Sequence, residues 1–211
     1  IRDWSESRGL GDVYKRQFIL LSFLISFDVN AFTLSQSVNS DHRDEKNMLR
    51  DRYRNPIETL NFFRVEPSMT IVELSPGRGW YTEILAKYMF ENGRYIAVPY
   101  NPNLGGYAER LWDNYSSLLQ SNEIYSKIEI SYLFDKMAED ESVDAVLTFR
   151  NIHNWINDGA KNAKIIFEQT YNVLRSGGFF GVVEHRAKIN TSVEDMYKSG
   201  YVTEQFIIDL A

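Results

Sequence analysis

The sequence has 211 residues, a formal net charge of −6 and no cysteine, with 44% hydrophobic and 25% charged residues. This length and composition fit one globular domain and exclude wholesale disorder and collagen-like repeats. The lack of cysteine excludes disulfides, a thiolate nucleophile and cysteine-ligated metal sites. The acidic balance argues against a nucleic-acid partner held by its phosphates, so no nucleic acid is expected as a partner.

The amino-terminal segment is predicted to lie outside the domain. Residues 11–17 resemble translated adapter sequence, so residues 1–17 are interpreted as a non-native leader. Residues 18–27 are apolar but too short to span a bilayer, which needs ~20 residues. With the small Ala31 as a cleavage position, residues 18–31 are predicted to be a signal peptide, which implies export or a periplasmic location and no stable membrane span after its removal. Otherwise the chain is expected in the cytoplasm.

The rest of the chain alternates between predicted strands and helices. Residues 32–43 are polar and are interpreted as a linker, so the domain is expected at 44–211. Apolar spacing predicts helix over 44–63, broken in two at Pro56. Strands are predicted at 70–75, 94–98, 127–134, 143–148 and 179–185, and helices at 80–90, 107–119, 160–174 and 203–211.

This alternation predicts an α/β fold with a doubly wound, mainly parallel sheet covered by helices on both faces. Ligands of such sheets bind outside the carboxyl ends of the strands, at the point where strand order reverses. The segments that follow the strands are therefore the places to search for functional residues.

The segment after the first of these strands has the most informative pattern, with Glu73 inside the strand and Gly77 and Gly79 in the turn. Glycines there let a ligand approach the backbone closely, and the following helix start favours an anionic group. A dinucleotide site would need a third glycine, where Thr82 stands, and an acid after the second strand, where residues 98–101 have none. A nicotinamide-dependent oxidoreductase is therefore the less favoured alternative.

The pattern E-x-x-x-G-x-G resembles motif I of the class I S-adenosylmethionine-dependent methyltransferases, and residues 143–148, 151–155 and 174–178 agree with further motifs in order and spacing. Residues 77–82, 150–153 and 183–186 resemble a bacterial family of predicted methyltransferases that often carry signal peptides. The resemblance implies a Rossmann-like fold, S-adenosyl-L-methionine as cofactor and a small-molecule methyl acceptor. It also implies two more strands, so the fold is expected to be truncated after strand five. The alternative is an exported, non-catalytic descendant that binds a ligand.

The resemblance also implies site residues. Glu73 would face the methionine amino group, Asn101 the ribose and Asp135 the adenine, while a structural carboxylate is the alternative for Glu73. The full set of expected cofactor-binding residues is Glu73, Ser75, Pro76, Gly77, Gly79, Tyr100, Asn101, Asp135 and Arg150.

Residues after the fourth predicted strand are the expected catalytic ones. His153 is the general-base candidate because imidazole titrates near neutrality, and Asn151 projects to the same side if the segment is extended. A loop histidine held by hydrogen bonds is the alternative for His153. His42 lies in the predicted linker and is expected to be solvated. No metal-binding spacing occurs, so no metal is expected.

Overall fold

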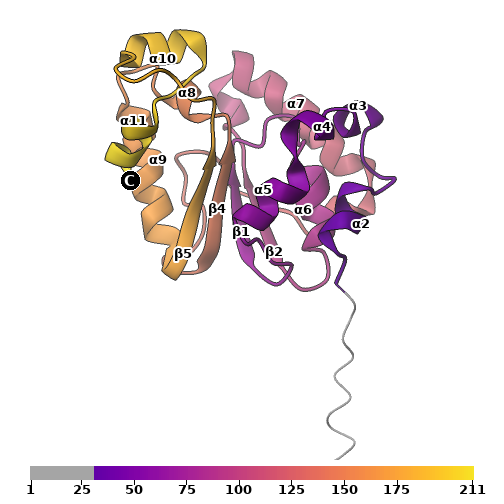
Figure 1. The fold of residues 1–211 in the computed structure, drawn as a ribbon. Coiled ribbons are helices and arrows are strands. Elements are labelled where there is room, and N and C mark those ends of the chain that lie inside the picture. The colour runs from indigo at the N-terminus through magenta and orange to yellow at the C-terminus, as the bar shows by residue number, and fades with distance from the viewer. Residues whose placement is uncertain (1–30) are drawn as a thin grey trace, which may run out of the picture. The chain divides into compact units, whose positions relative to one another are not determined.

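The computed structural model describes residues 31–211, and the predicted leader and signal peptide lie outside this range apart from Ala31. The described residues form a sheet of β1 (Thr70–Leu74), β2 (Arg94–Val98), β3 (Glu129–Ile130), β4 (Val143–Phe149) and β5 (Leu174–Val183). The strand order is β3-β2-β1-β4-β5 and every pairing is parallel. The predicted α/β class and parallel sheet are confirmed (Figure 1).

Helices cover both faces of the sheet. The amino-terminal helices are α2 (Leu34–Val38), α3 (Glu45–Met48), α4 (Asp51–Arg54) and α5 (Pro56–Phe62). They are followed by α6 (Thr82–Tyr88), η1 (Pro102–Leu104), α7 (Gly106–Ser121), η2 (Glu123–Tyr125), α8 (Ile152–Trp155), α9 (Lys161–Val173), α10 (Val193–Ser199) and α11 (Glu204–Leu210). Within residues 31–211, no helix is both long and apolar enough to cross a membrane.

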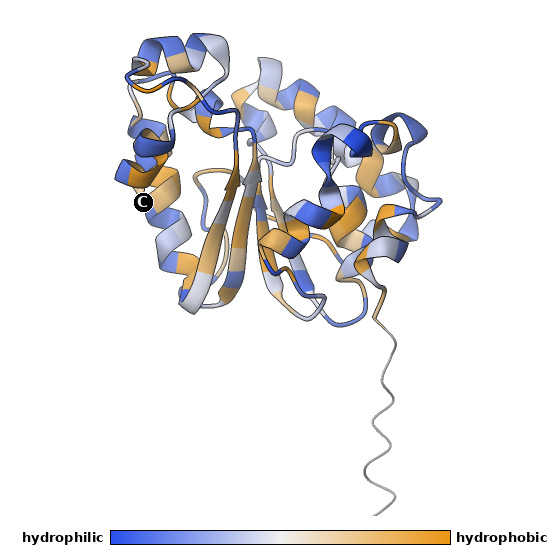
Figure 2. Cartoon of the chain, in the orientation of Figure 1, coloured by the Kyte–Doolittle hydropathy of each residue, from blue (hydrophilic) through white to orange (hydrophobic). Residues whose placement is uncertain are grey.

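Side chains of β1 alternate between two hydrophobic layers, as the two-residue period of a strand requires. Val72 and Leu74 belong to the layer that includes residues of α8, α9 and α10. Ile71 faces the other layer, which contains residues of α2, α5, α6 and α7. Burial of strands on both faces explains their apolar sequences, which Figure 2 shows as orange bands. Removal of this apolar surface from water is the main stabilising contribution to such a core.

The interpretation of residues 32–43 as a linker is wrong, because this segment contains α2 and packs on the domain. Thr33 and Gln36 form a reciprocal capping box at the start of α2, with Thr33 N donating to Gln36 Oε1 over 2.8 Å. Leu34 and Val38 are buried. The sequence T-x-x-Q is a helix-start signal that outweighs the polar composition of the segment.

Other boundaries differ in ways that local geometry explains. Residues 44–63 form three helices instead of two, and Asn55 with φ 45° separates α4 from α5 just before Pro56. β3 is shorter than predicted, and beyond it backbone bonds from Ser131 and Leu133 continue along the edge of β2. α8 and α10 were not predicted. α10 begins after Ser192, whose hydroxyl caps Asp195 N.

Candidate functional site

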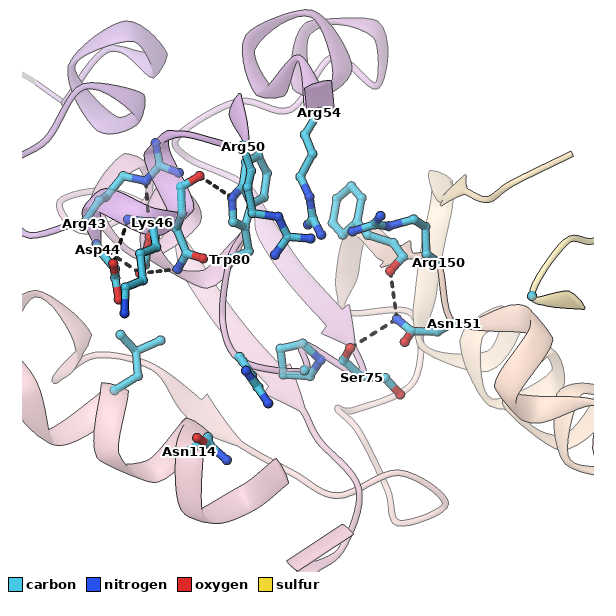
Figure 3. A pocket seen from close by; sticks show the side chains of 18 of the residues that line it. Arg43, Asp44, Lys46, Arg50, Arg54, Ser75, Trp80, Asn114, Arg150 and Asn151 are labelled. Atoms are coloured by element: carbon cyan, nitrogen blue, oxygen red, sulfur yellow. Dashed lines mark hydrogen bonds and ion pairs between the residues drawn. The ribbon is translucent and has the colours of Figure 1, made fainter. Parts of the chain in front are cut away.

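A cavity of about 1240 Å³ lies at the carboxyl ends of β1 and β4. These two strands are neighbours in the sheet although β2 and β3 come between them in sequence, so strand order reverses here. The switch point of a doubly wound sheet is its usual ligand site. The cavity walls come from the turn after β1, the turn after β4, His185 after β5, the end of α10, α7 and the segment around α3 and α4 (Figure 3).

The turn after β1 brings Ser75, Pro76 and Gly77, three of the expected cofactor-binding residues, to the cavity. Gly77 has φ 64°, and an added Cβ would meet nothing within 4 Å, so its backbone borders open space. The hydroxyl Oγ of Ser75 is buried and has no hydrogen-bond partner among the described residues. The open space beside Gly77 leaves room for a ligand next to this turn.

Gly79, another expected cofactor-binding residue, packs against α7. Its φ is 84°, and a Cβ at this position would lie 2.2 Å from Leu118 Cδ2 and 3.3 Å from Tyr115 Cε2. Gly79 does not line the cavity. It therefore allows α7 to pack closely under the turn, which is a structural requirement.

Glu73, which is expected to face the methionine amino group of the cofactor, does not line the cavity. It shares the α6 and α7 side of β1 with Ile71, because both are odd-numbered positions of the strand. Its carboxylate accepts hydrogen bonds from the hydroxyls of Tyr95 and of Thr82, the latter over 3.1 Å. Complete burial raises the pKa of Glu73 to about 7, and these two hydrogen bonds oppose the rise. The structural alternative for Glu73 matches this placement.

Tyr100, Asn101 and Asp135 are likewise absent from the cavity wall, although the sequence analysis expected all three to bind the cofactor. Tyr100 is half-buried against the layer that contains Trp155, and burial raises the pKa of its hydroxyl. The side chain of Asn101 caps η1 through Asn103 N. Asp135 is exposed in the turn after β3. Asn101 and Asp135 lie apart from Ser75 and Gly77, whereas the hydroxyl of Tyr100 lies close to the side chain of Ser75.

Asn151 lines the cavity and ties the ends of β1 and β4 together. Its Nδ2 donates to Leu74 O over 3.2 Å, to Ser75 O over 3.1 Å and to Thr148 Oγ1 over 3.1 Å. Figure 3 shows the amide beside Ser75. Asn151 thus holds the turn after β1 in place, which is a positioning role.

His153 also reaches the cavity, where Glu184 orients its ring. Nδ1 of His153 lies 3.1 Å from Glu184 Oε2, and the Glu184 side chain is only 3% exposed. The other carboxylate oxygen of Glu184 accepts the backbone N–H of His185 over 2.9 Å. If Nδ1 carries the proton, as this pairing favours, Nε2 is free to accept one. A Cβ added at Gly200 would lie 3.9 Å from Nε2, an ordinary contact distance, so Gly200 borders that side of the ring.

Glu184 lies in the motif at residues 183–186, but its pairing with His153 was not predicted, and neither were several basic side chains of the cavity. Glu184 could have been found because it follows β5, the neighbour of the strand that precedes His153. Arg50 and Arg54 line the cavity together with the predicted Arg150. The four-residue spacing of Arg50 and Arg54 is typical of one helix face, and it was the sequence signal that could have identified this pair. His42 is expected to be solvated, but it is half-buried, and its Nε2 lies 2.8 Å from Glu83 O.

No protein-family model matches the chain, and no curated protein matches it. Solved structures do. A SAM-dependent methyltransferase from Aquifex aeolicus superposes with a TM-score of 0.59 at 15% identity, covering 85% of this chain and 86% of that protein. The PH0226 protein from Pyrococcus horikoshii superposes with a TM-score of 0.56 at 14% identity, covering 86% of this chain and 89% of that protein. Geranyl diphosphate C-methyltransferase from Streptomyces coelicolor superposes with a TM-score of 0.55 at 11% identity, covering 82% of this chain and 63% of that protein.

The fold is the Rossmann-like methyltransferase fold. The predicted fold is thereby confirmed, and at these identities the similarity concerns the fold alone.

Proposed function

We propose that this chain is an S-adenosylmethionine-dependent methyltransferase that acts on a small-molecule acceptor. The observation that carries the proposal is the cavity at the switch point of a methyltransferase-like sheet, bordered by the open backbone of Gly77. The neighbour from Streptomyces coelicolor was solved in complex with S-adenosyl-L-homocysteine, which supports the choice of cofactor.

The cofactor would supply an electrophilic methyl group on a sulfonium. This chain's own residues would align the acceptor and remove its proton. His153 is proposed as the general base, because Nε2 borders the cavity while Nδ1 is held by Glu184. Glu184 is the positioning residue, since its carboxylate selects the tautomer and stabilises the imidazolium that forms. Asn151 keeps the turn after β1 at the distance that this arrangement requires.

Calorimetry with S-adenosyl-L-homocysteine tests the proposed cofactor. We expect saturable binding to the 211-residue chain. Gly77→Ala should raise the dissociation constant by about tenfold or more, because it places a methyl group where the cofactor approaches. The matched control is Gly177→Ala, because Gly177 also has a positive φ and open space around its Cβ position but lies at the amino end of β5.

The control variant should bind the ligand like the wild type. Absence of heat from the folded wild-type chain at millimolar S-adenosyl-L-homocysteine would overturn the proposed function. Binding without methyl transfer to any acceptor in a small-molecule extract would favour the non-catalytic, ligand-binding alternative.

A further inference from the structure

Among the arginines that line the cavity, which also include Arg43 and Arg78, three extend toward one space from two sides. Arg50 and Arg54 come from the α4 segment, and Arg150 comes from the turn after β4. Figure 3 shows the three side chains extending toward the same space above Ser75. Among residues 31–211, none of them forms an ion pair with a carboxylate.

The convergence of unpaired arginines is the local feature of the cavity. The chain has 29 acidic residues against 23 basic ones, and four arginines pair with carboxylates. Arg43 pairs with Asp51 over 2.7 Å, Arg94 pairs with Glu129 over 2.6 Å, Arg175 pairs with Asp144 over 2.5 Å and Arg186 pairs with Glu204 over 3.3 Å. Other arginines outside the cavity have no ion pair among residues 31–211 either, but only at the cavity do several unpaired guanidinium groups extend toward one space, which suits an external anion.

The carboxylates near the cavity are already engaged. Oδ1 of Asp44 accepts Lys46 N over 2.8 Å at the start of α3. Oε1 of Glu83 accepts Asn47 Nδ2 over 2.8 Å, and its Oε2 pairs with Arg43. Glu184 attracts Arg150 electrostatically but has its hydrogen bonds to His153 and the His185 amide.

The protein holds the side chain of Arg54 and the backbone of Arg150 in place. The guanidinium carbon of Arg54 lies 4.6 Å from the ring centroid of Trp80, whose indole N–H donates to Asn47 O over 2.8 Å. The backbone of Arg150 has φ 61°, and its N–H donates to Val183 O over 2.7 Å. Burial and the nearby positive charge of Arg50 lower the pKa of Arg150. The cluster therefore holds like charges together, and the nearby Glu184 carboxylate forms no ion pair with Arg150.

We propose that the methyl acceptor carries an oxyanion group, a carboxylate or a phosphate, bound by Arg50, Arg54 and Arg150. This inference rests on the proposed function. The guanidinium fork matches the paired oxygens of both groups and binds them by charge-assisted hydrogen bonds. The sulfonium of the cofactor adds a further positive charge to the cavity, so an anionic acceptor relieves the repulsion that a neutral acceptor would leave.

Small aromatic probes test the site without knowledge of the natural acceptor. Phenyl phosphate and benzoate present the two oxyanions, and phenol is the neutral control. Calorimetric titration of the wild-type chain should show binding of at least one anion and none of phenol, and the tighter anion identifies the class. In Arg50→Gln/Arg54→Gln the dissociation constant should rise by about tenfold or more.

Arg52→Gln is the matched control because Arg52 belongs to the same helix, lies 4.6 Å from the Tyr53 ring centroid and is not part of the cavity wall. Equal anion binding in the double variant and the wild type, or no anion binding to the wild type, would overturn the inference. Loss of S-adenosyl-L-homocysteine binding in the double variant would overturn it as well, because the arginines would then serve the cofactor carboxylate.

The same titrations separate this inference from the proposed function. A wild-type chain that binds S-adenosyl-L-homocysteine but no anion keeps the proposed function and refutes the anionic acceptor. A wild-type chain that binds the anions but not S-adenosyl-L-homocysteine refutes both the proposed function and the assignment of the anion as a methyl acceptor.

Discussion

Glu73→Gln tests the conclusion that the acid in the motif after β1 is a buried structural group. The carboxylate of Glu73 is 2% exposed and accepts hydrogen bonds from Tyr95 and Thr82. Desolvation raises its pKa from the ordinary 4.5 to about 7. Glutamine has nearly the same shape and can keep one acceptor for Tyr95, but it cannot ionise.

The raised pKa makes the stability of the domain depend on pH. Between its ordinary and raised pKa values, folded Glu73 retains a proton that the unfolded chain has released. The resulting stabilisation is complete below the unfolded pKa and is lost as the pH rises through the folded pKa. At 1.36 kcal/mol per pKa unit, the contribution of Glu73 to the free energy of unfolding falls by about 2.5 kcal/mol from about pH 5 to about pH 8.

Urea unfolding at several pH values, followed by circular dichroism, measures this dependence. The difference in free energy of unfolding between wild type and Glu73→Gln cancels the groups that both proteins share. We expect this difference to fall across the interval, so the variant gains relative stability at the higher pH. Glu139→Gln is the control, because Lys136 lowers the pKa of exposed Glu139 and moves its titration out of the interval. A flat difference for Glu73→Gln would refute the reasoning.

Two further predictions concern the proposed base and the buried ion pairs. His153→Ala should keep S-adenosyl-L-homocysteine binding but lower turnover by about 100-fold or more, as loss of a general base does. Glu184→Gln should also lower turnover, but by a smaller factor. Both effects are measured as the rate at which S-adenosyl-L-homocysteine is released when a small-molecule extract supplies the acceptor. Arg43→Met should lower the free energy of unfolding by about 3 kcal/mol, because it leaves buried carboxylates unpaired. Arg175→Met should cost under about 1 kcal/mol, because its ion pair is half-exposed; unfolding curves that rank the two the other way would contradict this.

The strands of the sheet centre could be predicted because their burial leaves a direct mark in the sequence. The bounds of β2 agree with the prediction, and those of β1 and β4 differ from it by one residue. The edge strand β3 could not be bounded, since both of its residues are exposed and only two of its positions pair. The short helices around the cavity were missed or merged for a related reason. They are four or five residues long, so apolar periodicity cannot show them, and caps such as that of Thr33 are their remaining signal.

Chain order predicts which residues follow the parallel strands, and therefore which residues lie at the same edge of the sheet. Ser75, Gly77 and His153 meet at the cavity because each follows a parallel strand whose carboxyl end lies there. The alternation within a strand places Glu73 on the opposite side, and the motif resemblance alone could not show this.

The pairing of His153 with Glu184 depends on strand register, which the sequence does not reveal. Phe149 pairs with Val183, so the residues just beyond these two positions leave β4 and β5 at the same level. Glu184 is the first residue after β5, and the turn after β4 returns His153 to it across 31 residues of sequence. A shift of one residue would turn Glu184 to the other face and leave His153 without its carboxylate. The register of β4 with β5 is therefore the structural feature on which the proposed base depends.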